Sequence, residues 1–214
     1  MNNQKDIEKS IFIQIGAGAG DLDPRVNNRD GFTEKIKKIS QDKIKKIILV
    51  EPNPLNITKL KECWKDYRQS EIHQVAIVPN SNLEDNIELL YCPDDGPHYQ
   101  VASIKESHVH KHYGQNCKIE KFVIKAVHLK DLIASSTNEV IELLAIDIEG
   151  VDAEVIMDLN LDEIKIKYLV YEHIHLSNFN DKIIKKLEEN GFKYLGFAYD
   201  HNQNDSLWVN KKYI

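Results

Sequence analysis

Cysteines and long apolar runs are both scarce in this sequence. Only three of its 214 residues are cysteine, and none forms a Cys-x-x-Cys pair, so neither a disulfide framework nor a zinc knuckle is expected. No apolar run approaches the roughly 20 residues that span a bilayer. The polar N-terminus, Met1 to Asp6, lacks the apolar stretch of a signal peptide. We therefore expect a cytoplasmic protein with free thiols and no membrane span.

Excess positive charge is missing as well. The chain has 28 Lys and Arg against 34 Asp and Glu, a formal net charge of -6 at pH 7. Nonspecific affinity for nucleic acid depends on clustered cations, so nucleic acid is not an expected partner. There is also no repeat and no Pro- or Gly-rich linker. We expect a single domain over residues 1–214, with a less regular region at about residues 83–121.

Short β-rich runs alternate with longer helical patterns along the chain. This alternation predicts an α/β fold in which strand–helix–strand units surround a mostly parallel sheet, doubly wound with helices on both faces. Expected strands span residues 11–15, 47–50, 72–77, 87–91, 122–127, 141–148, 168–172, 192–197 and 206–209, and helices begin near residues 33, 54, 153 and 181. The last two strands predict a closing antiparallel pair.

The turn after the first expected strand, residues 16–20, has glycine at every second position, and Asp21 follows it. Such a turn lets the backbone approach a ligand closely. A dinucleotide-binding fingerprint has glycine where Asp21 stands, and an acid repels a pyrophosphate, so a cationic ligand suits this turn better. Glu51, at the end of the second strand, is placed to accept hydrogen bonds from ribose hydroxyls, and Asn53 to add a contact. The alternative is a tight turn followed by an exposed loop acid.

Acidic and histidine residues end two later strands. Asp147 and Glu149 follow one strand and, with a period of two, are expected on the same face. Glu172, His173 and His175 end the next strand. The carboxyl ends of parallel strands face the ligand site, where a carboxylate or imidazole can remove a proton from a hydroxyl. We expect Asp147, Glu172 or His173 to be this base, with Glu149 and His175 on the substrate side; alternatively, Glu172 and His173 only hold neighbouring loops.

Three histidines alternate at positions 108, 110 and 112. In a helix, His108 and His112 share one face while His110 points away, and in a loop nothing fixes their geometry. One interpretation is a metal site. We prefer a lid or substrate-contacting segment, with His108 on the substrate side.

Four segments resemble, in order, the motifs of the FkbM family of S-adenosylmethionine-dependent O-methyltransferases. They are residues 12–20, 50–54, 145–150 and 171–176, and residues 190–192 resemble the helix-to-strand turn of that family. The resemblance implies a class I methyltransferase fold with a seven-stranded sheet and a C-terminal antiparallel hairpin. It also implies S-adenosylmethionine as methyl donor and a hydroxyl acceptor on a sugar, nucleotide-linked sugar or glycan.

The resemblance and the argument from the turn together define an expected cofactor pocket. Its residues are Gly16, Ala17, Gly18, Asp21, Glu51, Asn53, Ala76 and Asp147. Gln14 departs from the family pattern, because many class I enzymes have an acid before the glycines. Asp21 or Asp147 would then compensate at the methionine end. Participation of a divalent metal ion stays open.

Two other functions stay open at this point. An NAD(P)-dependent oxidoreductase is disfavoured by Asp21 and by the absence of a Tyr-x-x-x-Lys pair. A noncatalytic binding module on the same fold is disfavoured by the retention of Glu51, Asp147 and the Glu172–His173 pair. The sequence does not predict an oligomeric state.

Overall fold

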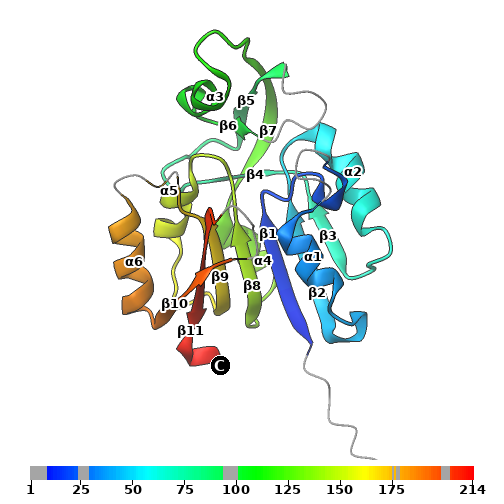
Figure 1. Cartoon of the computed structure of the whole chain (residues 1–214), viewed down its shortest axis with the longest axis vertical. Coiled ribbons are helices and arrows are strands. Elements are labelled where there is room, and N and C mark those ends of the chain that lie inside the picture. The colour runs from blue at the N-terminus through cyan, green and yellow to red at the C-terminus, as the bar shows by residue number, and fades with distance from the viewer. Residues whose placement is uncertain (1–8, 24–28, 94–100, 175, 177–178, 199–202) are drawn as a thin grey trace, which may run out of the picture.

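The chain folds around two β-sheets of different size (Figure 1). The computed structural model describes residues 9–23, 29–93, 101–174, 176, 179–198 and 203–214. The larger sheet has seven strands in the order β10-β11-β9-β8-β1-β2-β3. These are β1 (Ser10–Ile15), β2 (Ile44–Val50), β3 (Ser70–His73), β8 (Ile141–Ile146), β9 (Ile166–Glu172), β10 (Phe192–Phe197) and β11 (Asp205–Asn210).

Neighbouring strands of the larger sheet are parallel, except that β11 is antiparallel to both β9 and β10. Strand β1 lies between β2 and β8, so the chain changes direction across the sheet at this point. The carboxyl ends of β1, β2, β8 and β9 consequently meet at one edge, where ligands of doubly wound sheets bind. The expected mostly parallel seven-stranded sheet and its C-terminal hairpin are confirmed.

Helices cover both faces of the larger sheet because its strands bury alternate side chains on opposite sides. In β1, Ile13 and Ile15 pack in one apolar cluster and Phe12 packs in the other. The first cluster lies under α4 (Leu129–Ser136), α5 (Asp152–Asp158) and α6 (Asn180–Glu189), and the second under α1 (Gly31–Lys37) and α2 (Pro54–Trp64). Short 3-10 helices are η1 (Gly20–Leu22), η3 (Gln41–Lys43) and η6 (Lys211–Tyr213).

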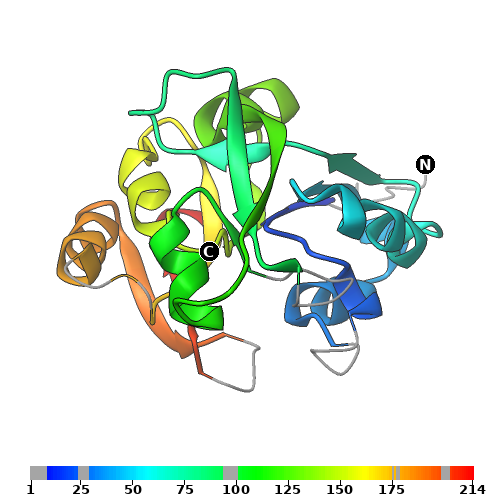
Figure 2. The same cartoon turned by 90° about the horizontal axis from the view of Figure 1, so that it is seen from above.

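The smaller sheet lies over the carboxyl edge of the larger one, as the view from above also shows (Figures 1 and 2). Its four strands have the order β4-β7-β5-β6. They are β4 (Ala76–Val78), β5 (Asn86–Tyr91), β6 (Ala102–Ser103) and β7 (Glu120–His128), accompanied by α3 (Glu106–Tyr113). A small apolar cluster that includes Val78, Ile87 and Leu89 holds this sheet together.

Two expected strands were wrong in their extent. The strand at 72–77 is split, because the chain leaves the larger sheet after His73 and starts β4 of the smaller sheet at Ala76. The strand at 141–148 already ends at Ile146. Glu149, three residues later, has a φ of 54°, in the left-handed region that a strand cannot contain.

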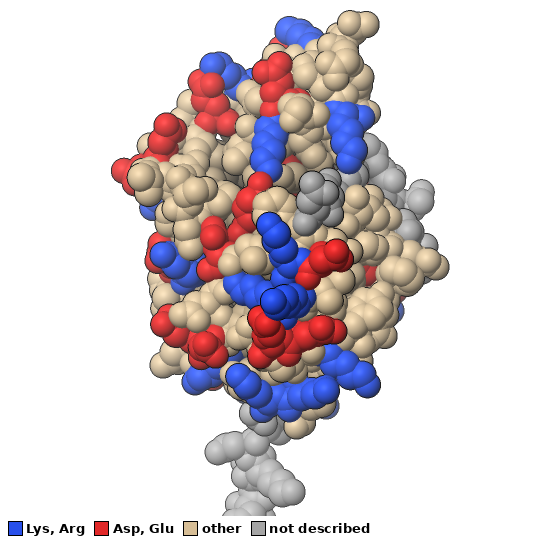
Figure 3. Space-filling model, turned by 90° about the vertical axis from the view of Figure 1, so that its left-hand side faces the viewer, with Lys and Arg blue, Asp and Glu red and all other residues tan. Residues whose placement is uncertain are grey.

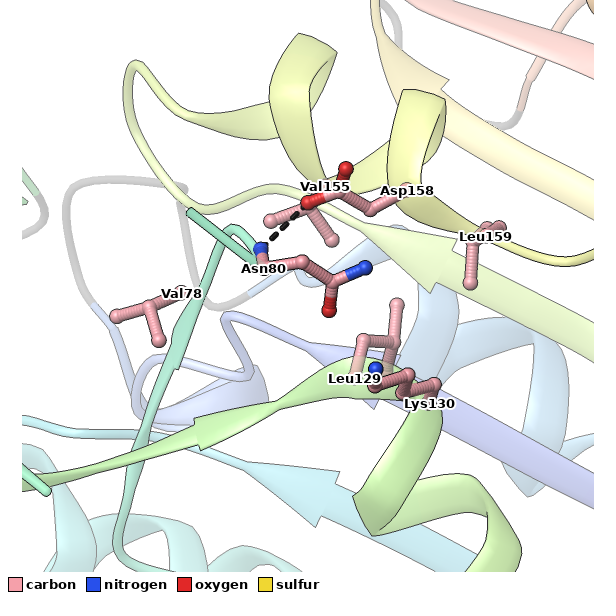
Figure 4. Close-up of a pocket in the computed structure, with 7 residues that line it drawn as sticks. All are labelled: Val78, Asn80, Leu129, Lys130, Val155, Asp158 and Leu159. Atoms are coloured by element: carbon pink, nitrogen blue, oxygen red, sulfur yellow. Dashed lines mark hydrogen bonds between the residues drawn. The ribbon is translucent and has the colours of Figure 1, made fainter. Parts of the chain in front are cut away.

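A small recess lies between the smaller sheet and the helices of the larger one (Figure 4). There the backbone N–H of Asn80, just beyond β4, donates to the Asp158 carboxylate at 2.5 Å, beside Leu129 at the start of α4. The recess has room for roughly one water molecule, so it is far too small for a nucleoside. Among the helices of the described residues, none combines the length and apolarity needed to cross a bilayer.

Candidate functional site

The turns after β1 and β8 lie in direct backbone contact at the carboxyl edge. The N–H groups of Gly16 and Ala17 both donate to the carbonyl oxygen of Val50 at 2.9 Å, and the N–H of Asp147 donates to that of Ile15 at 3.0 Å. Gly16 has a φ of +81°, and a Cβ atom there would lie 1.6 Å from the carbonyl oxygen of Asp147. Only glycine therefore permits this approach, which brings the glycine turn, the end of β2 and Asp147 together as expected.

Glu51 is buried at the tip of β2, with 5% of its surface exposed. Its Oε2 accepts the N–H of Gly18 at 2.8 Å, while Oε1 accepts the N–H of Asn53 at 2.8 Å and the side-chain amide of Asn56 at 3.3 Å. Burial raises the pKa of the Glu51 carboxyl, and these three hydrogen bonds oppose the rise. The carboxylate is therefore held rigidly beside the glycine turn, and its position there is not that of an exposed loop acid.

The space beside Gly18 is open. An added Cβ atom at this glycine, whose φ is +53°, would meet no other heavy atom within 4 Å. Asn53 caps α2 through its Oδ1, which accepts the N–H of Leu55 at 3.0 Å, while its buried Nδ2 has no hydrogen-bond partner among the described residues. The open side of Gly18 and the side-chain amide of Asn53 are therefore the groups that a polar ligand could contact at this turn.

Gln14 is partnered by an acid that the sequence interpretation missed. Its Nε2 donates to Asp30 Oδ1 at 3.0 Å, while Asp30 Oδ2 caps α1 by accepting the N–H of Thr33 at 2.7 Å. Asp30 thus brings a carboxylate within hydrogen-bond distance of the side chain at position 14. An Asx residue three positions before Thr33 is an N-cap signal. The sequence pattern predicts a helix from near Thr33, whereas α1 begins at Gly31 and Asp30 is its N-cap.

Three other expected cofactor residues make contacts within the protein. Asp21 forms an ion pair with Lys37 at 3.1 Å and accepts the N–H of Asp30 at 3.2 Å. Ala17 packs in the apolar cluster under α1 and α2, and Ala76 packs in the core of the smaller sheet. Their cofactor contacts remain predictions, and for Ala17 the backbone is the available part.

Asp147 lies among four other carboxyl groups. The residue is exposed on one side, but its carboxyl group is crowded by protein. This loss of water, followed by the charges of Glu149, Glu172, Asp152 and Asp205, raises the pKa of Asp147 well above its usual value. A carboxylate with a raised pKa is a stronger base than an ordinary aspartate. The expected grouping of Asp147 and Glu172 from neighbouring strands is therefore present.

The pairing of β9 with β11 fixes the positions of Glu172 and His173. Glu172 is opposite Asp205 in the sheet, and the His173 N–H donates to the carbonyl oxygen of Asn204 at 2.9 Å. The His173 ring stacks on Phe197, with centroids 5.7 Å apart. Its buried Nδ1 has no hydrogen-bond partner in the described part of the chain. The expected substrate-side residue His175 lies outside the described residues.

The loop after β8 turns Glu149 toward the smaller sheet. Because β8 ends at Ile146, the argument that a strand period places Asp147 and Glu149 on one face is wrong. Glu149 Oε2 lies 2.9 Å from Nε2 of His108 in α3, and its carbonyl oxygen accepts the Ser103 hydroxyl at 2.7 Å. The sequence had no signal for this contact, because it depends on how the smaller sheet docks.

The alternating histidines fall on a helix. In α3, His108 and His112 share a face, with ring centroids 4.8 Å apart. His110 points elsewhere: its Nδ1 lies 3.1 Å from the Gly114 carbonyl oxygen. The helical alternative is therefore confirmed, and it places His108 against the loop that carries Asp147.

A known protein family matches most of the chain. The family model of the methyltransferase FkbM domain matches residues 14–194, which include the glycine turn, Glu51, Asp147 and His173. No curated protein matches the chain.

Several solved structures are similar to this chain. A methyltransferase FkbM from Methylobacillus flagellatus KT has 12% sequence identity and a TM-score of 0.49, over 94% of this chain and 43% of that chain. Fibrillarin from Aeropyrum pernix, which contains bound S-adenosyl-L-methionine, has 12% identity and a TM-score of 0.43, over 97% of this chain and 69% of its own. The N-methyltransferase NodS from Bradyrhizobium japonicum WM9 has 12% identity and a TM-score of 0.46, over 95% and 86%. The present chain thus spans less than half the length of the FkbM protein.

Proposed function

Because the chain belongs to the FkbM methyltransferase family, we propose that it transfers a methyl group from S-adenosylmethionine to a hydroxyl oxygen of a sugar, nucleotide-linked sugar or glycan. One observation carries the proposal. The buried Glu51 carboxylate, fixed by the N–H of Gly18, lies at the same sheet edge as the carboxyl group of Asp147. This arrangement supports a role for Glu51 in binding the ribose and for Asp147 as the base, beside one open glycine turn.

The cofactor side is supported by the chemistry of the residues around this turn. Glu51 would accept hydrogen bonds from the ribose hydroxyls, and the partnerless Nδ2 of Asn53 would donate one. Asp30, held by Gln14, and Asp147 would face the positively charged methionine end. When bound, S-adenosylmethionine supplies a methyl group on a positively charged sulfur, which suits an acidic site better than a phosphate-bearing cofactor does.

The acceptor side is supported by the carboxyl cluster. A hydroxyl group must lose its proton as it takes a methyl group, so a base within hydrogen-bond reach is required. Asp147 is our first choice because its raised pKa would make its carboxylate a stronger proton acceptor than an ordinary aspartate. Glu172 and His173, from the adjacent strand, are the alternatives. Alignment of the acceptor with the donor would supply most of the remaining rate acceleration.

The charge distribution favours a sugar or glycan over nucleic acid as the acceptor. The chain has a net charge of -6, and acidic and basic side chains are interspersed over the side of the molecule in Figure 3. A nucleic-acid backbone is bound by clustered cations. Sugar hydroxyls, in contrast, are readily bound by carboxylates such as those around Asp147. We propose that the described parts of the region at 83–121, residues 83–93 and 101–121, contact this acceptor.

Isothermal titration with S-adenosylmethionine, S-adenosylhomocysteine and NADH tests the cofactor. We expect both adenosyl ligands to bind and NADH not to bind. Binding of NADH alone would contradict the proposal and favour an oxidoreductase. Transfer of radiolabelled methyl groups to a panel of nucleotide sugars and oligosaccharides then tests the acceptor.

A noncatalytic binding module is distinguished by the Asp147→Asn variant. We expect this variant to lose methyl transfer while it keeps affinity for the glycan or sugar identified in the panel. If no methyl transfer occurs in the wild-type protein although the adenosyl ligand and sugar both bind, the module is the better description.

A further inference from the structure

Helix α3 and the loop after β8 bring two histidines and a carboxylate together outside the residues assigned above to cofactor and base. His108, His112 and Glu149 each offer one ligand atom, and these three atoms all lie within 4.8 Å of one another. The two histidines are separated by one helical turn, and the glutamate comes from a segment distant in sequence. Figure 1 shows this helix over the ends of the central strands.

We propose that His108, His112 and Glu149 form a binding site for a divalent transition-metal ion, with Zn²⁺ as the best fit. Imidazole nitrogen and carboxylate oxygen are ordinary zinc ligands, and two histidines four residues apart on one helix can bind the same ion. Ligand atoms around tetrahedral zinc lie roughly 3.3–3.6 Å apart, given bonds of about 2.0–2.2 Å. His108 Nε2 and Glu149 Oε2 are 2.9 Å apart, so modest side-chain rotations would produce this geometry.

The protein holds two of the ligands firmly. His108 has only 8% of its side chain exposed, and its ring packs against Gly150, where an added Cβ atom would lie 2.9 Å from Nδ1. Glu149 has the left-handed φ of 54°, which is unfavourable for a residue other than glycine and is often found at functional sites. Binding energy from the ion would offset the cost of this conformation.

Neighbouring side chains fix the backbone that presents Glu149. Its carbonyl oxygen accepts the Ser103 hydroxyl at 2.7 Å, and the Gly150 carbonyl oxygen accepts the Lys105 ammonium at 2.6 Å. Asp152 accepts the Gly150 N–H at 3.2 Å. These contacts hold the loop in the conformation that directs the Glu149 side chain toward His108.

The third ligand lies at the surface of the site. His112 is exposed, so its ring can turn toward the ion without repacking of the core. Three protein ligands leave a fourth position for water or a substrate oxygen, which is the pattern of catalytic rather than structural zinc. If the proposed methyl transfer holds, this position would face the acceptor; the metal site itself does not depend on that function.

A zinc titration of the chain without a polyhistidine tag tests the site. The chelator-treated protein is titrated with Zn²⁺ against a chromogenic chelator, with no adenosyl ligand present, so a failed methyltransferase assay does not affect the result. We expect one equivalent to bind, and His112→Ala and Glu149→Gln each to weaken binding by at least about tenfold. His110→Ala, on the same helix but another face, should bind zinc like the wild type.

Amide hydrogen exchange gives a second measurement. Zinc should slow exchange across residues 106–113 in the wild type but not in His112→Ala, while circular dichroism checks that each variant is folded. The proposal is overturned if the wild type binds no zinc, if His112→Ala binds it equally well, or if His110→Ala loses it. In these cases the His108–Glu149 contact only attaches α3 to the loop.

Discussion

Gly16 and Asp147 touch backbone to backbone, so that a methyl group on Gly16 would overlap the Asp147 carbonyl oxygen at 1.6 Å. The contact joins the turn after the first strand to the turn after β8, and so the proposed cofactor side of the site to the proposed base. We expect Gly16→Ala to cost roughly 1–2 kcal/mol for its left-handed backbone and roughly 1–3 kcal/mol more for the overlap. Urea denaturation followed by circular dichroism measures this loss; unchanged stability would contradict the contact.

Gly18→Ala is the matched variant in the same turn. Its φ of +53° carries the same cost of roughly 1–2 kcal/mol, but the new methyl group meets nothing within 4 Å. The variant should therefore remain folded. The methyl group would occupy the space beside Glu51, so we expect affinity for S-adenosylhomocysteine to fall by about tenfold or more, equal to 1.4 kcal/mol. Equal affinity in calorimetry would place the cofactor elsewhere.

The pKa of Glu51 gives ligand binding a pH dependence. Burial raises this pKa, so the carboxylate becomes protonated at a higher pH than an ordinary glutamate. If the ionised form accepts the ribose hydroxyls, affinity for S-adenosylhomocysteine should fall as the pH is lowered through the raised pKa, by up to about tenfold per unit. Calorimetry between pH 5 and 8 measures this, and Glu51→Gln should bind weakly with a flatter profile.

The raised pKa of Glu51 has the opposite effect on the stability of the ligand-free protein, which it lowers as the pH rises. A carboxyl group with a raised pKa favours the folded state while it is protonated, so this contribution is lost as the pH rises from the usual glutamate value through the raised one. Glu51→Gln should lack this component in melting curves recorded over that pH range. An increase in the Glu51 component with rising pH would show that the hydrogen bonds to the carboxylate outweigh burial.

Asp147→Asn should stabilise the fold while it removes methyl transfer. The four surrounding carboxyl groups and the crowding protein disfavour a charge at this position, and asparagine has none. Because solvent screens charges at an exposed residue, we expect only a small rise in melting temperature at pH 7, below the roughly 2–4 °C that about 1 kcal/mol produces in a chain of this size. Asp131→Asn, on α4 outside the cluster, is the control. A lower melting temperature for Asp147→Asn alone would mean that its carboxylate stabilises the loop.

Sequence patterns predicted the larger sheet well because its strand ends have clear signals. Gly16 ends β1 and Pro52 follows β2, so the positions of Glu51 and the glycine turn could be read directly. No glycine or proline separates His73 from Ala76, and two strands of different sheets were therefore merged into one. Local patterns contain no information about such a change of sheet.

The sequence could predict only those residues of the candidate site that lie at the ends of strands of the larger sheet. Parallel strands bring Gly16, Glu51, Asp147 and Glu172 to one edge, and this followed from the alternation of strands and helices. The contact of His108 with Glu149 depends on the docking of the smaller sheet and on a left-handed residue in the loop. Neither has a signature in a single sequence.

The place of β1 in the middle of the larger sheet also affects how the chain is made. Ile13 pairs with Ile48 on one side and with Leu144 on the other. During synthesis its second edge stays without its partner until most of the chain has left the ribosome. Such distant pairings slow folding and expose strand edges to aggregation. We therefore expect fragments that end before residue 141 to aggregate, although they contain the whole glycine turn and Glu51.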